Sequence, residues 1–251
     1  MKYLIESENE EIVEEYSEKL DRRGLEVVDR YSQDEDLVLV SLGGDGSILY
    51  NAWNNDEPTI LPIVSGKSDG NKIQLGEEDL FEAVELVEND QYYLERHRQL
   101  TAYNEGGEEL KGDFRTLGEI IFNKRTFIRA AIFNIEIEDE NIDLSYESEK
   151  LVGDGAVFAT PFGSGGYFYA ITEDTFESGI GIAFNNVRDS SVEDYIRATE
   201  EATVRITVPD SLNPDHSSRA VMSRDNDPDF YYPEIGETVE IEFSDSFVEI
   251  V

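Results

Sequence analysis

The sequence predicts a Rossmann-like α/β domain followed by an antiparallel, β-rich domain. Over residues 1–90, short apolar runs alternate with segments of helical periodicity, which is typical of a parallel sheet covered by helices. From residue 91 onward, apolar and polar side chains alternate, as in 131–139 and 239–243, which is typical of antiparallel strands with one buried face. We therefore predict an α/β domain at 1–90 and a β-rich domain at 91–251.

The elements of the first domain follow from these patterns in order. Apolar residues recur at helical spacing from Ile12 to Leu20, and Gly24 ends that helix. Polar, glycine-containing loops separate the runs. The expected strands are residues 2–6, 25–28, 37–42 and 60–64, and the expected helices are residues 12–20, 47–54 and 80–87.

The stretch at residues 43–47, Gly-Gly-Asp-Gly-Ser, follows a buried strand and precedes a helix. Its glycines leave the backbone open to close approach by a bulky, charged group. Ser47 is expected to cap the following helix, where free amides and the helix dipole favour phosphate. Asp45 is the one carboxylate there, so it can accept a proton from an attacking hydroxyl or hold a phosphate-bound metal. The alternative is an ordinary surface turn, since Asp-Gly is common in turns.

A second polar loop, residues 65–71, follows the strand at 60–64 and contains Gly66. The carboxyl ends of parallel strands lie at one edge of the sheet, where ligands bind in such folds. Gly66 is therefore a second candidate for phosphate binding, beside Gly43, Gly44, Gly46 and Ser47.

The composition restricts the partners. Asp and Glu number 57 against 20 Lys and Arg, a formal net charge of −37, while 39% of the residues are hydrophobic. Such a surface suits a cytoplasm of molar salt, where the Debye length falls to about 3 Å, so we interpret the charge as halophilic adaptation rather than disorder or nucleic-acid mimicry. It argues against nucleic acid and anionic membranes as partners.

The same composition limits the chemistry and the location. Cysteine is absent, which excludes disulfides and thiolate catalysis, and the two histidines are too few for a His-rich metal site. No secretory signal and no run of about 18 apolar residues is present. We expect a soluble cytoplasmic protein without a resident metal.

Within the second domain, residues 153–167 are rich in glycine and also carry an Asp, a Thr, a Ser and a Tyr. Glycine at this density weakens a strand and often marks the close approach of a ligand or another backbone. The alternative is a hairpin rim with a flexible loop.

With these segments, the chain resembles the NAD kinase family. Four features coincide in order over nearly the whole chain. Gly-Gly-Asp-Gly alone also occurs in phosphofructokinases and in diacylglycerol and sphingosine kinases, so the glycine-rich segment about 110 residues later adds most of the specificity. The four features are Leu-Gly-Gly-Asp-Gly-Ser at 42–47, Glu-Arg-His-Arg-Gln-Leu at 95–100, Leu-Gly-Glu-Ile at 117–120, and Gly-Asp-Gly through Tyr at 153–167.

The resemblance implies phosphorylation of the 2′-hydroxyl on the adenosine ribose of NAD by ATP or polyphosphate. It gives Asp45 the role of general base or activator of that hydroxyl, and directs the amides of the loop glycines to the phosphates. Mg²⁺ would arrive with the triphosphate, bound mainly to phosphate oxygens and water. Catalysis would come from alignment and charge neutralisation.

The resemblance also assigns the dinucleotide end of the site and an oligomeric state. Family members form dimers or tetramers with sites shared across a subunit boundary, so a homodimer or homotetramer is expected here. NAD or NADH would be the acceptor. The residues that the resemblance places on it are Glu119, Asp154, Ser164, Gly165 and Tyr167.

Several positions depart from the family pattern. The family's Asn-Glu pair is Gly118-Glu119 here, and its Gly-Ser-Thr-Ala-Tyr is Gly-Ser-Gly-Gly-Tyr at residues 163–167. The chain therefore lacks side chains that would hydrogen-bond the dinucleotide, whereas the phosphate-binding loop at residues 43–47 matches the family pattern. Two alternatives stay open: a non-catalytic nucleotide-binding paralogue, and a Gly-Gly-Asp-Gly kinase with a sugar or lipid acceptor.

Overall fold

The computed structural model describes residues 1–33, 36–65, 72–73, 75–110, 114–126, 128–188, 192–209 and 220–251. The chain forms two compact units: unit 1 is Met1–His97 with Ser246–Val251, and unit 2 is Arg98–Asp245. The prediction of one division after residue 90 places all C-terminal residues in the second domain, whereas Ser246–Val251 belong to unit 1 in the structure. Their return to unit 1 has a physical cause, because Glu249 and Ile250 pair in parallel with Thr59 and Ile60.

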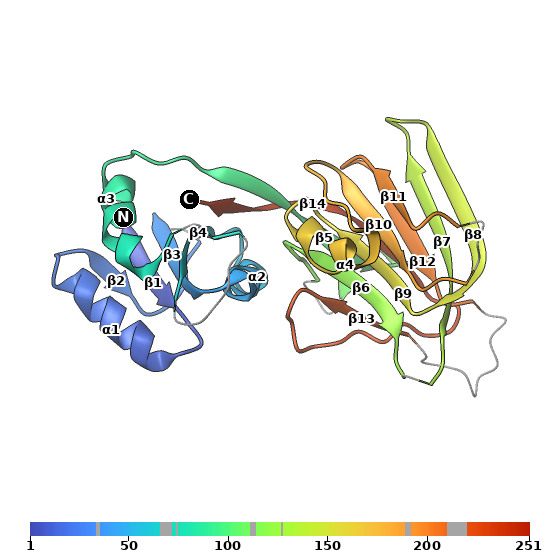
Figure 1. Ribbon diagram of the computed structural model, residues 1–251, viewed down its shortest axis with the longest axis horizontal. Coiled ribbons are helices and arrows are strands. Elements are labelled where there is room, and N and C mark those ends of the chain that lie inside the picture. The colour runs from blue at the N-terminus through green and yellow to red at the C-terminus, as the bar shows by residue number, and fades with distance from the viewer. Residues whose placement is uncertain are drawn as a thin grey trace. The chain divides into compact units, whose positions relative to one another are not determined.

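Unit 1 is built on a parallel sheet (Figure 1). Its strands are β1 (Lys2–Glu6), β2 (Glu26–Val28), β3 (Leu37–Gly43) and β4 (Thr59–Val64), in the order β2-β1-β3-β4, with the end of β14 (Thr238–Ile250) beside β4. All residues of β3 are buried, as expected of a strand covered on both faces. The carboxyl ends of β1 and β3 therefore lie at the same edge of the sheet.

Helices cover this sheet. The described helical elements of unit 1 are α1 (Glu10–Asp21), α2 (Asp45–Asn54), the 3-10 turn η1 (Glu77–Asp79) and α3 (Leu80–Glu88). Apolar side chains of α1 and α3 form one cluster with β1, β3 and β4, while α2 buries Ile48 and Ala52. The predicted alternation of strands and helices is confirmed.

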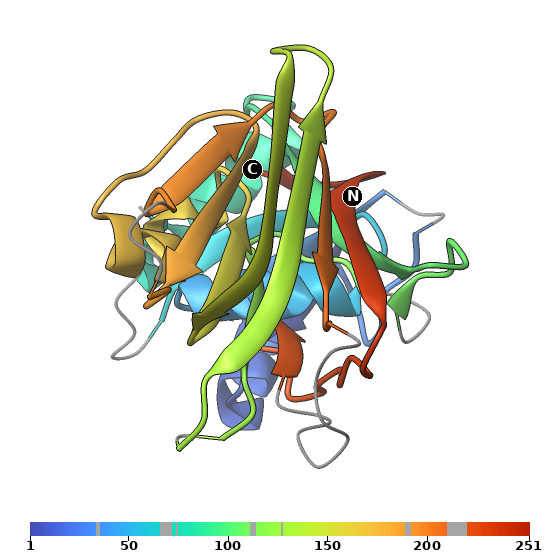
Figure 2. The same ribbon diagram turned by 90° about the vertical axis from the view of Figure 1, so that its right-hand side faces the viewer.

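Unit 2 consists of antiparallel strands in two sheets, and Figure 2 shows the long hairpin of β7 and β8. In one sheet the order is β14-β12-β7-β8, with β5 beside β14, and in the other it is β11-β10-β9-β6-β13. The strands are β5 (Glu95–Asn104), β6 (Glu119–Lys124), β7 (Ala131–Asp139), β8 (Leu144–Gly153), β9 (Gly155–Ala159), β10 (Ile180–Asn185), β11 (Tyr195–Ala198), β12 (Thr203–Thr207) and β13 (Ala220–Arg224), together with β14.

One large apolar cluster, which includes Phe122, Phe133 and Phe158, draws on strands of both sheets of unit 2. This is the packing of a β-sandwich. In a smaller apolar cluster, Phe168 and Phe176 pack against residues of β9 and β10. Phe168 belongs to α4 (Tyr167–Thr172), which follows the 3-10 turn η3 (Gly163–Gly165). The sequence does not predict α4, because six residues are too few to show helical periodicity.

None of the described helices is long and apolar enough to span a membrane.

Candidate functional site

The glycine loop of unit 1 connects β3 to α2. Gly43 ends the strand, Gly44 is the helix N-cap in an extended conformation (φ −108°, ψ −166°), and Asp45 is the first helical residue. No side chain caps this helix end. The positive end of the α2 dipole lies at this loop, where it favours an anionic group.

The prediction that Ser47 caps α2 is wrong. The helix begins at Asp45, so Ser47 is already inside its first turn, and its amide donates to the carbonyl of Gly44 (3.0 Å). Its hydroxyl lies against Gly43 instead: a Cβ built on Gly43 would lie 2.0 Å from Ser47 Oγ. The glycine thus makes room for the serine hydroxyl.

The carboxylate of Asp45 lies at the amino end of α2, where the helix dipole favours negative charge. Its Oδ1 accepts a hydrogen bond from the backbone amide of Lys72 (3.1 Å). This contact ties the chain that follows the second polar loop to the glycine loop. Gly66, the predicted phosphate-binding residue of that second loop, lies outside the described residues.

In unit 2, the carboxylate of Glu119 holds the start of α4. Glu119 is the first residue of β6 and is 8% exposed. Its two oxygens accept hydrogen bonds from the backbone amides of Tyr167 (3.0 Å) and Phe168 (2.6 Å). A carboxylate that the sequence analysis assigned to a ligand therefore also satisfies two amides at a helix amino end.

Burial raises the pKa of Glu119 to about 7 from an ordinary 4.5; the two amides oppose that rise, and the nearby charge of Asp225 adds to it. Between pH 4.5 and 7, the folded protein therefore holds a proton that the unfolded chain has released. The contribution of Glu119 to the free energy of unfolding is largest below pH 4.5 and falls, by roughly 3 kcal/mol, as the pH rises through 7.

We predict that Glu119→Gln removes this part of the pH dependence. The free energy of unfolding in urea should fall less between pH 5 and pH 8 for the variant than for the wild type, because glutamine does not titrate. Subtracting the two curves cancels the titration of the many surface carboxylates. Parallel curves for the two proteins would show that Glu119 titrates as it does in the unfolded chain.

Two glycines let the backbone close around Glu119. A Cβ on Gly166 would lie 2.8 Å from Glu119 Oε2, and one on Gly163 would lie 2.2 Å from the carbonyl oxygen of Gly118. A Cβ on Gly165 would meet nothing within 4 Å. Gly166 stands where the family pattern has alanine, so the Glu119 carboxylate lies in space that this alanine would fill.

Ser164 and Tyr167 lie in the same turn but differ in exposure. Ser164 is buried, and its hydroxyl donates to the carbonyl of Pro161 (2.8 Å) and accepts from the amide of Phe176 (3.4 Å). The side chain of Tyr167 is 59% exposed. The serine therefore orders the turn, whereas the tyrosine ring is presented to the surroundings.

Asp154 lies at the junction of β8 and β9. Its carboxylate accepts hydrogen bonds from Lys124 Nζ and from Asn186 Nδ2 (2.9 Å), and the bond from Lys124 is the main cause that lowers its pKa. Lys124 ends β6, whereas Glu119 begins it. The structure therefore brings Glu119, Ser164, Gly165 and Tyr167 together and places Asp154 at the opposite end of that strand.

Asp225 is a residue that the sequence analysis missed. Its carboxylate accepts hydrogen bonds from the amides of Leu117 (3.1 Å), Gly118 (3.1 Å) and Glu119 (2.8 Å). It therefore fixes the loop from which Glu119 projects. The one signal in the sequence, an Asp-Asn pair after an apolar run, does not differ from an ordinary turn.

We predict that Asp225→Asn lowers the free energy of unfolding by about 2 kcal/mol, because an amide group offers one acceptor where the carboxylate offers two, and bonds to a charged group are lost. Urea unfolding at constant molar KCl measures the change. Asp229→Asn, an exposed substitution that follows the same strand, is the matched control. Equal midpoints for the two variants would show that the three amide contacts do not stabilise the loop.

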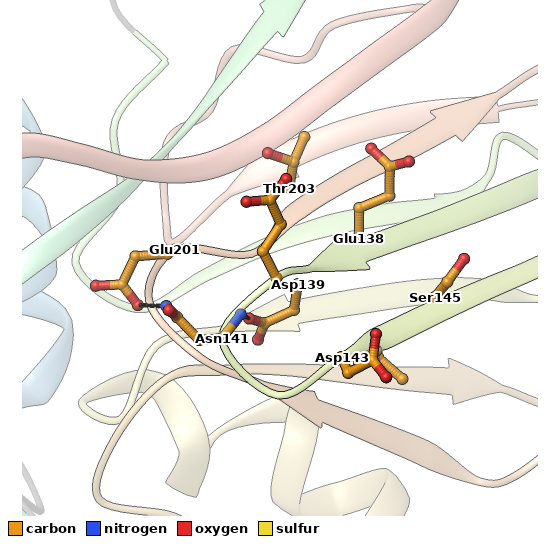
Figure 3. A pocket seen from close by; sticks show the side chains of 9 residues that line it. Glu138, Asp139, Asn141, Asp143, Ser145, Glu201 and Thr203 are labelled. Carbon is orange, nitrogen blue, oxygen red and sulfur yellow. Dashed lines mark hydrogen bonds between the residues drawn. The ribbon is translucent and has the colours of Figure 1, made fainter.

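An acidic pocket of about 580 Å³ lies at the turn between β7 and β8 and is lined by Asp139, Asn141 and Glu201 among others (Figure 3). Asp139 is 2% exposed, and its oxygens already accept from Thr199 (amide 2.6 Å, hydroxyl 3.1 Å) and from the amide of Asn141 (3.0 Å). These bonds hold the turn. The pocket contains none of the predicted site residues, and no group of three or more acidic or histidine side chains placed to hold a metal is found in the described part of the chain.

The chain is similar in sequence to NAD kinases. It is 31% identical over 130 residues to the NAD kinase of Chlorobium phaeobacteroides, a match that covers 52% of this chain and 43% of that protein. It is 30% identical over 138 residues to that of Methanothermobacter thermautotrophicus, covering 54% and 44%. Each match thus spans less than half the length of the relative. No family model matches the chain.

Solved structures of the same fold cover the whole chain. A yeast NADH kinase complexed with NADH superposes with a TM-score of 0.79 at 16% identity, covering 100% of this chain and 82% of that one. An NAD kinase from Archaeoglobus fulgidus in complex with ATP superposes with a TM-score of 0.77 at 18% identity, covering 100% and 93%. At these identities the superpositions establish the fold, an α/β part followed by a β-rich part.

The sequence matches, which all carry one name, and the shared fold agree with the ordered motifs of the sequence. The predicted resemblance of the chain to the NAD kinase family is therefore confirmed.

Proposed function

We propose that the protein transfers a phosphoryl group from ATP or polyphosphate to the 2′-hydroxyl on the adenosine ribose of NAD or NADH. The observation that carries this proposal is the loop at residues 43–47, with its uncapped helix end and the carboxylate of Asp45 beside it. The sequence similarity of the chain to NAD kinases supports the choice of acceptor.

In the proposed reaction, Asp45 accepts the proton of the ribose hydroxyl as its oxygen attacks the terminal phosphorus. The new bond joins the 2′-oxygen to phosphorus, the bond from that phosphorus to the bridging oxygen breaks, and ADP leaves, or, with polyphosphate as the donor, the chain shortened by one phosphate. The glycine loop and the positive end of the α2 dipole would stabilise the charge on the phosphate oxygens. Mg²⁺ enters as part of the substrate, bound to the triphosphate.

The dinucleotide would contact unit 2 through the turn that carries Tyr167 and through Glu119. The exposed ring of Tyr167 supports a contact with a base, since aromatic faces stack on planar groups. A Cβ built on Gly165 would meet no atom within 4 Å. This space supports the proposal that a ligand approaches the backbone closely there. Asp154 and Ser164 belong to the proposed binding segment as well. We propose that the active form is a homodimer or homotetramer.

The setting we propose is a cytoplasm with molar salt. The support is the net charge of −37, which repels itself at ordinary ionic strength and is screened in concentrated KCl. Assays should therefore use about 2–3 M KCl, where the Debye length is below about 3 Å.

A specific observation favours one alternative, a nucleotide-binding paralogue without catalysis. Gly118, Gly165 and Gly166 replace side chains of the family pattern, and both oxygens of Glu119 are engaged by α4. Such a protein would bind NAD without phosphorylating it.

A panel of acceptors with MgATP in about 2–3 M KCl separates the possibilities. NADP formed from NAD, or NADPH formed from NADH, supports the proposal. Consumption of ATP with a sugar or a lipid alcohol, but not with NAD, would contradict it. A rise of the melting temperature with NAD or ATP, without any turnover, would identify the non-catalytic paralogue, because a ligand that binds the folded state stabilises it.

A further inference from the structure

A buried ion pair lies beside the segment that leads to Glu119, residues 115–119, which we call the Glu119 loop. Arg224, the last residue of β13, donates from Nε to Oδ2 of Asp227 (2.9 Å), and the two side chains are 9% and 6% exposed. The guanidinium also lies over the ring of Phe114, with its Cζ 5.4 Å from the ring centroid. An acid and an aromatic ring therefore fix the guanidinium in place.

The same guanidinium binds the Glu119 loop. Its Nη1 donates to the backbone carbonyl oxygen of Arg115 (3.0 Å), at the start of the loop. The carboxylate of Asp225, the residue after Arg224, accepts hydrogen bonds from the amides at the end of the loop, including that of Glu119 (2.8 Å). Two consecutive residues at the end of β13 therefore hold both ends of the loop.

The other contacts of the Glu119 loop differ in kind. Thr116 exchanges two backbone hydrogen bonds with Leu100 of β5 (2.8 and 3.0 Å), and the carbonyl oxygen of Gly118 accepts from the backbone amide of Thr160 (3.0 Å). Such contacts join backbone to backbone and do not depend on the identity of a side chain. The carbonyl of Arg115, in contrast, is bonded to a side chain, so the position of the loop depends there on one residue type.

Stability alone does not account for this buried ion pair. The cost of removing two charges from water largely offsets their attraction, and apolar residues of similar volume often replace such a pair without loss of stability. The planar guanidinium, however, can bind a carboxylate and a carbonyl oxygen at the same time in a fixed geometry. This property suits a group that fixes the position of a loop.

We propose that Arg224 is a positioning residue for the dinucleotide acceptor. By holding the carbonyl of Arg115, it fixes the course of the Glu119 loop and the place from which the Glu119 carboxylate projects. The inference rests on the proposed function and deepens it, because acceptor binding then depends on a buried group that does not itself touch the acceptor. The phosphate donor, which we place at the glycine loop of unit 1, should bind independently of Arg224.

Two variants separate positioning from stability. Arg224→Met leaves the charge of Asp227 buried without its cation, so it should destabilise the fold as well as weaken NAD binding. Arg224→Met/Asp227→Leu removes both charges and should unfold in urea at a midpoint near that of the wild type. The carbonyl of Arg115 has still lost the donor of Arg224. We therefore expect the double variant to bind NAD about tenfold more weakly, the effect of losing a charge-assisted hydrogen bond.

A third variant covers the case in which the double variant does not fold. Arg224→Lys keeps a cation for Asp227 but lacks the planar fork that binds two acceptors in a fixed geometry. It should therefore fold as the wild type does and bind NAD more weakly. If it folds and binds NAD as tightly as the wild type, a positive charge alone is sufficient and the positioning role of the guanidinium is overturned.

Equilibrium dialysis of NAD in molar KCl, without ATP, measures the affinity and does not depend on turnover. The dissociation constant for MgATP, measured in the same way without NAD, should equal that of the wild type in each folded variant. Arg205→Met is the matched control. It removes a cation of β12 that pairs with Glu240 (2.9 Å) and Glu138 (2.8 Å), and it should leave both affinities unchanged.

The outcomes distinguish this inference from the proposed function. If the wild type forms NADP, the double variant should show a KM for NAD about tenfold higher, with the KM for ATP unchanged. If the wild type binds NAD but forms no NADP, the proposed function fails, whereas weaker NAD binding by the double variant would still support the positioning role. The inference is overturned if the folded double variant binds NAD as tightly as the wild type, or if its affinities for NAD and ATP fall equally.

Discussion

Asp45→Asn is expected to lower the rate of NADP formation about a thousandfold, within the range of roughly 10²–10⁴ that a positioned general base contributes. Asparagine has nearly the same shape as aspartate but cannot accept the proton of the attacking hydroxyl. Its Oδ1 can still accept the hydrogen bond from the amide of Lys72, so the connection between the two loops should survive. The loss should appear in kcat, with little change in the KM for either substrate.

The control for this prediction is Asp21→Asn, which removes the same charge at an exposed position at the end of α1. Its rate should equal that of the wild type. Both variants should melt within a few degrees of the wild type in the same KCl concentration, since a charge at a helix end contributes at most about 1 kcal/mol, which separates catalysis from folding. Asp45→Asn with a rate within about threefold of the wild type would remove Asp45 from the role of base, since a general base contributes at least about a hundredfold.

Gly163→Ala is expected to have the largest effect on stability. The added Cβ would lie 2.2 Å from the carbonyl oxygen and 2.4 Å from the carbonyl carbon of Gly118. These are backbone atoms, and the amide of Thr160 donates to that same oxygen (3.0 Å), so the contact cannot be relieved by rotating a side chain. We expect a loss of about 3 kcal/mol in the free energy of unfolding, the upper part of the range for overpacking.

The neighbouring Gly165→Ala is a matched control, because its Cβ would meet nothing within 4 Å in the same turn. Urea unfolding should give a clearly lower midpoint for Gly163→Ala and a midpoint near the wild-type value for Gly165→Ala. Gly163→Ala should also weaken NAD binding, since Gly118 precedes Glu119. Equal destabilisation by the two substitutions would contradict the described packing of the turn against residue 118.

The sequence predicts the parts of the fold that depend on local patterns. The apolar run of β3 and the periodicity of α1 and α3 stand out because a doubly covered strand and an amphipathic helix each impose a recurring pattern. The sequence places the start of α2 wrongly, because serine is preferred over glycine as an N-cap residue, whereas Gly44 is the N-cap here. Glycine at a helix start leaves no signal that distinguishes it from the other glycines of the loop.

The site was harder to predict where its contacts are made between distant segments. Asp45 and the glycines could be recognised because strand, loop and helix follow one another in the chain. The carboxylate of Glu119 is held by hydrogen bonds from the amides of Tyr167 and Phe168. The loop that ends at Glu119 is held by hydrogen bonds to the carboxylate of Asp225. No spacing rule relates these residues, because they meet only through the pairing of β6 with β9 and with β13.

The central claim is that this chain phosphorylates the 2′-hydroxyl of NAD. The most direct test is the transfer of labelled γ-phosphate from MgATP to NAD by the purified protein in about 2–3 M KCl, conditions that screen its surface charge. The position of the label is then read by an NADP-specific dehydrogenase, which distinguishes the 2′-phosphate. The account predicts labelled product that this dehydrogenase accepts. A folded protein that binds NAD and leaves it unlabelled, or that labels another position, would contradict it.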